Sequence, residues 1–220
     1  MKQHHKKMDF LPEDINDYSE RHSQGEFAVL AELNRETWSK VLQPRMLSGH
    51  LQGRVLSMLS KMIQPKRILE IGTYTGYAAL CMAEGLGEGG KLHTIDKNEE
   101  LADMVNTYVR KAGFENQIEL HIGNALDIVP KLNEAWDLVF IDADKQNYSN
   151  YYDLLIDQMK NGTYLIADNV LWSGKVTEDY ESLDEETKAL VDFSKKVQED
   201  ERVENVLFPI RDGLMVMRKK

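Results

Sequence analysis

"LEIGTYTGYAAL", residues 69–80, decides the fold class of this chain of 220 residues. Its apolar beginning is typical of a buried strand, and its end is typical of a helix. Gly72 and Gly76 lie in the turn between the two, where small residues let a ligand approach the backbone. The glycines alone fit a tight turn of any α/β protein equally well. The stretch therefore predicts a strand–turn–helix unit, with a ligand at its turn as a hypothesis.

From about residue 67 onward the chain alternates short apolar runs with helical patterns, which indicates βαβ units and a parallel sheet. Five runs are predicted strands: 67–72, 91–96, 118–123, 136–142 and 163–169. Two further runs, 203–210 and 213–219, are separated only by Arg211 and Asp212. This is too little chain for a crossover helix, so the pair must form an antiparallel hairpin. The sequence thus predicts an α/β fold: a Rossmann-like, doubly wound, seven-stranded sheet, mostly parallel, with a C-terminal antiparallel hairpin.

Helical patterns also precede the first strand. Residues 13–64 predict two or three helices, with Pro12 at their beginning and Pro65 at their end. We predict one domain, in which residues 1–66 form an N-terminal helical extension and residues 67–220 form the core.

Three helices of the core have predicted ends, because residues that cap helices flank them. They are residues 99–112 between Asn98 and Gly113, residues 148–161 before Gly162, and a helix over 184–198 capped by Asp184. The acidic residues of the last helix predict a solvated face.

Charge and cysteine content exclude several classes of protein. The net charge is −10, and because residues 1–66 are close to neutral, the remainder carries −12. Such a surface repels phosphate backbones, so nucleic acid is an unlikely partner. The single cysteine, Cys81, excludes an internal disulfide and a multi-cysteine metal site, and it is expected to be a small buried apolar residue.

The first ten residues, "MKQHHKKMDF", are charged and lack the apolar centre of a signal peptide. No later stretch is long and apolar enough to predict a membrane span. We therefore expect a cytoplasmic protein without a membrane association. His4 and His5 could bind a metal, but histidines in a lysine-rich terminal tail are more often solvated.

A nucleoside site is predicted at the carboxyl ends of the first two strands. Asp96 ends the second strand, twenty positions after Gly76, and in a doubly wound sheet these ends lie side by side. A carboxylate there can accept both ribose hydroxyls. Tyr74 stands where a dinucleotide fingerprint requires glycine, which weakens an NAD interpretation. Glu70 suits a cationic amine better than a phosphate, and S-adenosylmethionine is a nucleoside with such a tail.

A metal site is predicted where the fourth and fifth strands end. Asp142, Asp168 and Asn169 would converge there, and an oxygen-only ligand set selects a hard cation such as Mg²⁺, with Mn²⁺ or Ca²⁺ as alternatives. Each of these residues could instead cap a turn. Lys145 follows Asp142 by three residues, and a divalent cation beside its ammonium would favour loss of a proton. This makes Lys145 a candidate proton acceptor, provided that the metal is present.

At these residues the chain resembles the cation-dependent class I O-methyltransferases, the family of catechol and caffeoyl-CoA O-methyltransferases, as a bacterial member. The resemblance covers about residues 30–219. It is carried by these stretches: "RETWSKVLQPRMLSGHLQGRVLSML", "LEIGTYTGYAAL", "GKLHTIDKN", "FIDADKQNY", "ADNVLWSGKV" and "PIRDGLMVMRK".

The resemblance implies a role for each matching position. Asp142, Asp168 and Asn169 would be the metal ligands, and Lys145 would be the general base. The S-adenosylmethionine pocket would include Ser48, Glu70, Gly72, Thr73, Gly76, Ala78, Asp96, Ala125, Asp142 and Asp144. Two departures stand out. Ala78 replaces a serine of the plant members, which removes a hydroxyl contact to the cofactor, and Ser173 replaces an asparagine that contacts their acyl-CoA substrate.

The function expected from these features is methylation of a hydroxyl of a catechol-like small molecule, dependent on S-adenosylmethionine and a divalent metal. The resemblance also implies a homodimer. Three alternatives stay open: a tRNA-modifying methyltransferase of the same fold, a nicotinamide-dependent oxidoreductase, and a non-catalytic protein that senses S-adenosylmethionine. Trp172 either covers the acceptor or belongs to the core.

Overall fold

The computed structural model describes residues 12–220 and contains one seven-stranded sheet with the order β3-β2-β1-β4-β5-β7-β6. The strands are β1 (Arg67–Ile71), β2 (Lys91–Asp96), β3 (Ile118–Ile122), β4 (Leu138–Ile141), β5 (Tyr164–Ala167), β6 (Val203–Phe208) and β7 (Leu214–Lys219). β1 to β5 pair in parallel, and β7 pairs antiparallel with both β5 and β6. The predicted Rossmann-like sheet and its reversed hairpin are confirmed. His4 and His5 lie outside the described residues.

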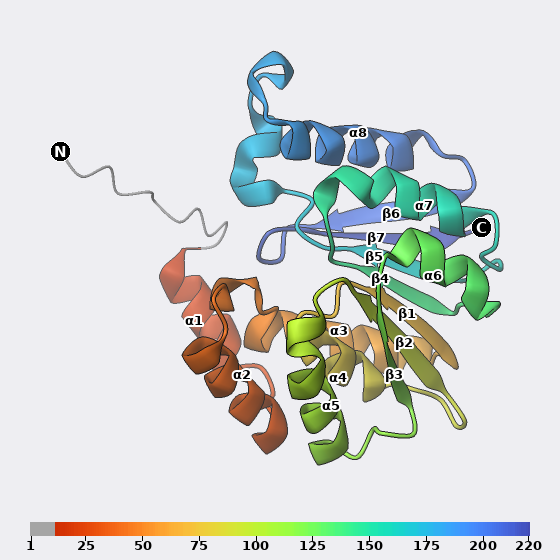
Figure 1. Ribbon diagram of the computed structural model, residues 1–220. Helices are drawn as coiled ribbons and strands as arrows, with labels where there is room; N and C mark the ends of the chain where they lie inside the picture. Colours follow the sequence, from red (N-terminus) through yellow and green to blue (C-terminus); the bar gives the residue numbers. More distant parts are fainter. Residues whose placement is uncertain (1–11) are drawn as a thin grey trace.

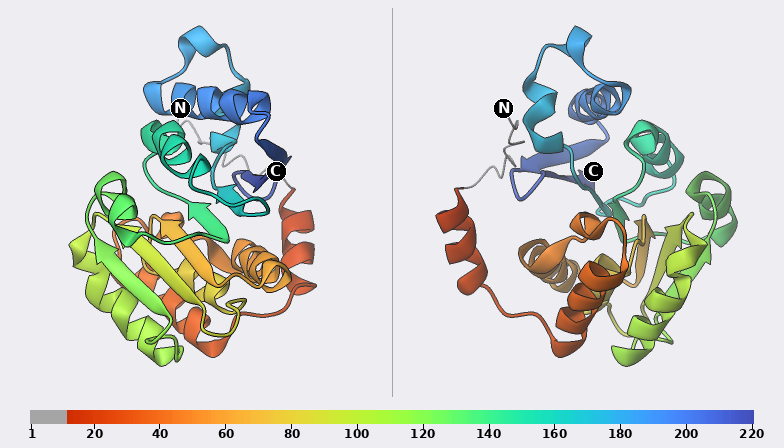
Figure 2. Two further views of the ribbon diagram at one scale, coloured as in Figure 1. Left: turned by 90° about the vertical axis from the view of Figure 1, so that its right-hand side faces the viewer. Right: turned by 60° about the vertical axis from the view of Figure 1, so that its left-hand side comes forward.

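Helices cover both faces of the sheet, as Figures 1 and 2 show. They are α1 (Glu13–Arg21), α2 (Ala28–Lys40), α3 (Gly49–Ile63), α4 (Tyr77–Ala83), α5 (Ala102–Lys111), α6 (Ala125–Leu132), α7 (Tyr148–Ile156) and α8 (Glu185–Glu199). The short 3-10 helices are η1 (Pro44–Met46), η2 (Glu99–Leu101), η3 (Lys145–Asn147), η4 (Trp172–Thr177) and η5 (Tyr180–Ser182). Within residues 12–220, every helix falls short of the length and apolar character needed to cross a bilayer.

Two hydrophobic cores form, one on each face of the sheet. Leu69, Val139 and Leu165 alternate along their strands with neighbours that point the other way, and they pack with α6, α7 and α8. Ile68 and Phe140 point to the opposite face and pack with α2 to α5. β1, β4 and β5 are buried on both faces, as expected for central strands of a parallel sheet.

The predicted helix ends agree in part with the structure. The Asp184 side chain caps α8 by accepting a hydrogen bond from the Thr187 amide at 2.8 Å, as predicted. Asn98 caps η2 instead, and α5 begins at Ala102. α7 ends at Ile156, before the predicted end at residue 161, and the chain continues in a turn in which Met159 is buried in the core.

Gly72 joins β1 to the loop after β4 by close backbone approach. Its φ is +100°, and a Cβ at this position would lie 1.9 Å from the Asp142 carbonyl oxygen. The Asp142 amide donates to the Ile71 carbonyl at 2.8 Å, so the two segments are already paired. Any side chain at residue 72 would push Asp142 away from its position.

We expect Gly72→Ala to lower the free energy of unfolding by about 3 kcal/mol, since strain from positive φ adds to the collision with Asp142. Chemical denaturation measures this loss. Gly113→Ala is the matched control: its φ is +77° and nothing lies within 4 Å of the added Cβ, so a loss of about 1 kcal/mol is expected. Equal losses in the two variants would show that close packing against Asp142 is unimportant.

Candidate active site

A cavity of about 920 Å³ opens at the carboxyl ends of the parallel strands. This is where ligands bind in doubly wound sheets. Nine of the predicted site residues line it: Ser48, Gly72, Asp96, Ala125, Asp142, Asp144, Lys145, Asp168 and Asn169. Four others do not line it: Glu70, Thr73, Gly76 and Ala78. The predicted metal and nucleoside positions thus share one cavity.

Lys145 lies at the centre of the predicted metal cluster. Its ammonium donates to Asp142 Oδ1 at 3.1 Å and to Asn169 Oδ1 at 2.7 Å. Asp142 follows β4 and Asn169 follows β5, and these strands are paired in register, which brings the two side chains together. Lys145 itself begins η3 and is 6% exposed. A buried cation is therefore held by oxygen atoms from two neighbouring strand ends.

Tyr148 and Trp172 hold the Lys145 ammonium from the other side. Lys145 Nζ donates to the Tyr148 hydroxyl at 2.6 Å, and this hydroxyl donates to the Asp168 carbonyl at 2.9 Å. Burial raises the pKa of Tyr148 well above its ordinary value, so the phenol stays neutral. The Trp172 ring centre lies 5.6 Å from Lys145 Nζ. Trp172 both lines the cavity and packs on the core, so the two alternatives for this residue are not exclusive.

We expect Tyr148→Phe to lower kcat by about tenfold, because Lys145 would lose one of the bonds that orient it. Binding of S-adenosylhomocysteine, which is the predicted cofactor S-adenosylmethionine without its methyl group, should be unchanged when it is measured by calorimetry. Tyr152→Phe is the control, since its hydroxyl is bonded to Asp200 and not to the cavity residues. A loss of kcat in the control as large as in Tyr148→Phe would contradict the positioning role.

Asp168 is buried and held in a single orientation. The Gln52 side chain donates to Asp168 Oδ2 at 2.6 Å, and the backbone N–H of Asn169 donates to Asp168 Oδ1 at 2.7 Å. Burial, and then the charge of Asp142, raise the pKa of Asp168 to about 7, although Lys145 opposes this shift. Asp168 is buried and Asp142 is partly exposed, and because both line the cavity, their negative charges would stabilise an additional cation there.

Asp96 and Asp144 supply carboxylate oxygens at the nucleoside end of the cavity. Asp96 accepts hydrogen bonds from the Tyr74 amide at 2.7 Å and the Asn98 amide at 2.8 Å, one on each oxygen. Each oxygen retains a lone pair for a ligand hydroxyl. Burial alone would raise the pKa of Asp144, but hydrogen bonds, including one from the Tyr151 hydroxyl at 2.6 Å, hold it below the ordinary value. Asp144 is therefore an anion that can accept further hydrogen bonds.

Glu70 is buried beneath the glycine turn. Its Oε2 accepts a hydrogen bond from Thr94 Oγ1 at 2.5 Å, while its Oε1 is buried without a protein partner. Burial raises the pKa of Glu70 well above its ordinary value, and Asp142 and Asp96 add to this effect. Thr73 shares the network through Thr94. The predicted contact of Glu70 and Thr73 with a cofactor stays a prediction, as does that of Gly76 and Ala78.

Several residues of the site were missed by the sequence reasoning. Gln52 contacts Asp168 from α3, a separation of 116 residues along the chain. Arg211, which had been considered only as part of the hairpin turn, lines the cavity and donates to the Leu47 carbonyl at 3.0 Å. The sequence predicted helices over residues 13–64, but it could not show which helical residue faces the end of a strand. The signal that marks Gln52 as a site residue is the burial of its polar side chain, and this burial is visible only in the folded structure.

The strand order, the reversed β7 and the cavity at the strand ends define the class: this is the α/β fold of the class I methyltransferases. A family described as O-methyltransferase matches residues 20–220. The caffeoyl-CoA O-methyltransferase of Medicago sativa is 34% identical over 196 residues, which cover 84% of this chain and 79% of the relative. The chain therefore belongs to this O-methyltransferase family.

Solved structures agree with this assignment. The O-methyltransferase from Bacillus cereus in complex with SAH superposes with a TM-score of 0.87 and 28% identity, covering 94% of this chain and 97% of that one. The SAH-bound methyltransferase PaMTH1 of Podospora anserina has a TM-score of 0.86 and 28% identity, with 94% of each chain covered. The predicted O-methyltransferase activity class is confirmed, and the oxidoreductase and non-catalytic alternatives are set aside.

Proposed function

We propose that the protein transfers the methyl group of S-adenosylmethionine to a hydroxyl of a catechol-like small molecule with the help of a divalent cation. The observation that carries this proposal is the cluster at the strand ends. There Lys145 lies between Asp142 and Asn169, beside the buried Asp168, in the cavity that also contains Asp96.

S-adenosylmethionine is supported as the donor by the shape and charge of the cavity. Asp96 and Asp144 place carboxylates where ribose hydroxyls and a cationic ligand are favoured. Gly72 leaves the backbone accessible at the turn. The Bacillus cereus and Podospora anserina proteins bind SAH, the product that remains after methyl transfer.

The donor set fits a hard divalent cation. Asp142, Asp168 and Asn169 offer only oxygen atoms, which Mg²⁺, Mn²⁺ and Ca²⁺ prefer. The Lys145 ammonium bridges two of these side chains, which supports a cluster that favours positive charge. When bound, the cation would stabilise the negative charge that develops on the acceptor oxygen.

Lys145 is proposed as the general base. Its amine, once deprotonated, takes the proton of the acceptor hydroxyl, and the oxygen then attacks the methyl carbon in line as the carbon–sulfur bond breaks. S-adenosylhomocysteine leaves, and both electrons of the broken bond stay on sulfur. Tyr148 and Asn169 aim the amine at the cavity through the hydrogen bonds described above. Holding both reactants in one orientation contributes much of the rate.

A catechol is favoured as the acceptor because the caffeoyl group of the plant relatives' named substrate carries two adjacent hydroxyls. Ser173 lies where those relatives have an asparagine that contacts the acyl-CoA, so a thioester substrate is not implied. The tRNA-modifying alternative is disfavoured by the charge of −12 beyond residue 66. A gel shift with bulk tRNA at low salt would distinguish a tRNA-modifying enzyme from one that methylates a small molecule.

The decisive test is a methyl-transfer assay across a panel of catechols and matched monophenols, with Mg²⁺ or with excess EDTA. We expect turnover of catechols that requires the cation, and little turnover of the monophenols. Equal turnover of the two classes would reject the catechol proposal. Activity that survives in EDTA would reject the metal.

The proposal includes a homodimer in the cytoplasm. The N-terminal helices and the segment after α2 expose large apolar side chains at Tyr18, Trp38, Leu42, Met58 and Met62. Exposed large apolar side chains of this kind lose their contact with water when two copies associate, which favours association. Light scattering coupled to gel filtration would measure the mass, and a monomer at micromolar concentration would contradict this part of the proposal.

A further inference from the structure

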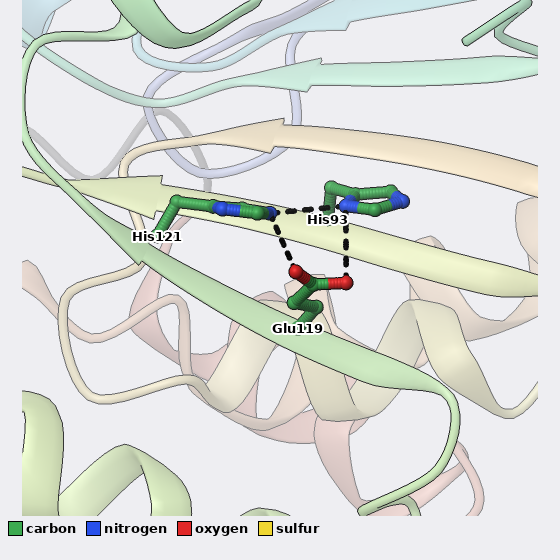
Figure 3. Close-up of side chains that lie close together, drawn as sticks. All are labelled: His93, Glu119 and His121. Carbon is green, nitrogen blue, oxygen red and sulfur yellow. Dashed lines mark hydrogen bonds and ion pairs between the residues drawn. The ribbon is translucent and has the colours of Figure 1, made fainter. Parts of the chain in front are cut away.

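A second group of potential metal ligands lies on the sheet away from the catalytic cluster. His93 on β2 is paired in register with Glu119 on β3, and His121 follows Glu119 by two residues, so all three side chains point to the same face. Figure 3 shows the two imidazole rings with their nitrogen atoms directed at each other and the Glu119 carboxylate beside them. The strand register alone therefore assembles two histidines and one carboxylate.

The spacing of these atoms is close to that of a metal site. His93 Nδ1 lies 3.0 Å from His121 Nε2, and each of these nitrogens lies 3.8 Å from an oxygen of Glu119. One ligand atom from each residue lies within 4.8 Å of the others. Tetrahedral Zn²⁺ with bonds of about 2.0–2.1 Å separates its ligand atoms by about 3.3 Å. A tetrahedral ion would need the two imidazole nitrogens to separate by about 0.3 Å and each ring to turn so that its nitrogen faces the ion. The exposed Glu119 side chain would bring its carboxylate closer to both nitrogens.

We propose that His93, Glu119 and His121 bind a borderline transition-metal dication, Zn²⁺ in the first instance, at a site separate from the oxygen-only cluster. Two imidazoles and one carboxylate select such ions over Mg²⁺ and Ca²⁺. Three protein ligands leave one position for water. The cluster of Asp142, Asp168 and Asn169 has the opposite preference, so the chain would sort two classes of cation.

The surroundings of His93 support this assignment. Its Nε2 is buried and has no hydrogen-bond partner among the described residues, while Glu134 Oε1 lies 4.0 Å away on that side of the ring. Glu134 is itself held by Arg67 at 3.0 Å. Histidines that bind metals through one nitrogen commonly direct the other at a carboxylate. A metal on Nδ1 would fix the proton on Nε2, where it faces Glu134.

The site lies close to the catalytic cavity but is not part of it. Ile95 follows His93 by two residues on β2, Gly123 follows His121 by two residues just after β3, and both line the cavity. His93, Glu119 and His121 do not. A metal there would link β2 to the edge strand β3 immediately beside the nucleoside end, and it would stabilise the folded state by binding to it.

Zinc binding to the full-length protein tests the proposal. His4 and His5 are replaced by alanine in every sample, because a histidine tail can bind zinc, and excess Mg²⁺ is added to occupy the oxygen cluster. Zn²⁺ is then titrated against a chromogenic chelator. We expect one equivalent of Zn²⁺ to bind, and His121→Ala to remove that equivalent. Glu119→Gln, a change at an exposed side chain, should weaken binding by at least about tenfold without altering the fold.

His22→Ala is the matched control, since this exposed histidine follows the end of α1, away from the sheet, and should leave the stoichiometry unchanged. Glu134→Gln should weaken Zn²⁺ binding by about tenfold while every ligand is retained. If the background protein binds no equivalent of Zn²⁺, or binds one that His121→Ala does not remove and Glu119→Gln does not weaken, the proposal is overturned. The three residues would then be only a hydrogen-bonded histidine pair beside a surface carboxylate. This experiment measures zinc binding and not methyl transfer, so its result does not depend on the proposed function.

Discussion

Replacing Lys145 with alanine is expected to lower kcat by about 10²–10⁴-fold, the range in which a positioned general base contributes. The amine is the group in the cavity that can accept the acceptor's proton beside Asp142 and Asn169. Binding of S-adenosylhomocysteine should change little, because Asp96, and not Lys145, is the residue proposed to hold its nucleoside end. The loss of kcat is measured at saturating S-adenosylmethionine, and the affinity for S-adenosylhomocysteine is measured separately by calorimetry.

The matched control is Lys97→Ala. Lys97 also lines the cavity, but its ammonium lies near Asp144, 3.7 Å away, at the nucleoside end. We expect a loss of donor affinity in this variant with kcat nearly unchanged. Lys145→Ala also removes hydrogen bonds to two proposed metal ligands, so Mg²⁺ affinity must be measured in parallel. Equal losses of kcat and donor affinity in Lys145→Ala would argue against a base.

Much of the fold could be predicted because strands of a parallel sheet carry a strong local signal. β1 and β4 are buried on both faces, and such strands read as short continuous apolar runs bounded by turns. The hairpin followed from the two residues between its strands. The end of α7 could not be predicted, because neither glycine nor proline follows Ile156 directly, whereas Gly162 marks a later end.

The predicted site residues depend on the same local signal. Asp142, Asp168 and Asn169 were found because each follows a strand, and parallel strand ends share an edge. Gln52 could not be found in this way, since its partner lies on a distant segment. For Glu70, the sequence predicts the position in the strand but not the contacts of the side chain. Its place within β1 is evident, but only the folded structure shows that Thr94 engages it and that it does not line the cavity.

The close contact of Gly72 with Asp142 also lay beyond sequence reasoning, and it links fold to function. Gly72 was expected to let a ligand approach the turn. The structure shows that it also lets the loop carrying Asp142 approach β1. The stability of this turn and the position of a proposed metal ligand are therefore determined together.

Replacing Asp168 with alanine is expected to abolish metal-dependent methyl transfer, with a loss in kcat of about 10³-fold or more. The variant keeps Asp142 and Asn169 but loses the most buried of the three proposed metal ligands, whose Oδ2 accepts a hydrogen bond from the Gln52 side chain at 2.6 Å. The loss of Asp168 also leaves the Gln52 amide without its partner, so a modest fall in stability is expected. Mg²⁺ titration of turnover, with calorimetry for S-adenosylhomocysteine, measures both consequences.

Asp153→Ala is the control for Asp168→Ala, because Asp153 is an exposed carboxylate paired with Lys196 on the outer surface of α7. It should change neither the Mg²⁺ dependence nor the binding of S-adenosylhomocysteine. If Asp168→Ala binds S-adenosylhomocysteine normally but has lost turnover at every Mg²⁺ concentration, the loss lies in the chemical step. Turnover of Asp168→Ala that stays close to that of the unaltered protein and keeps the same Mg²⁺ dependence would show that Asp168 is not needed to hold the cation.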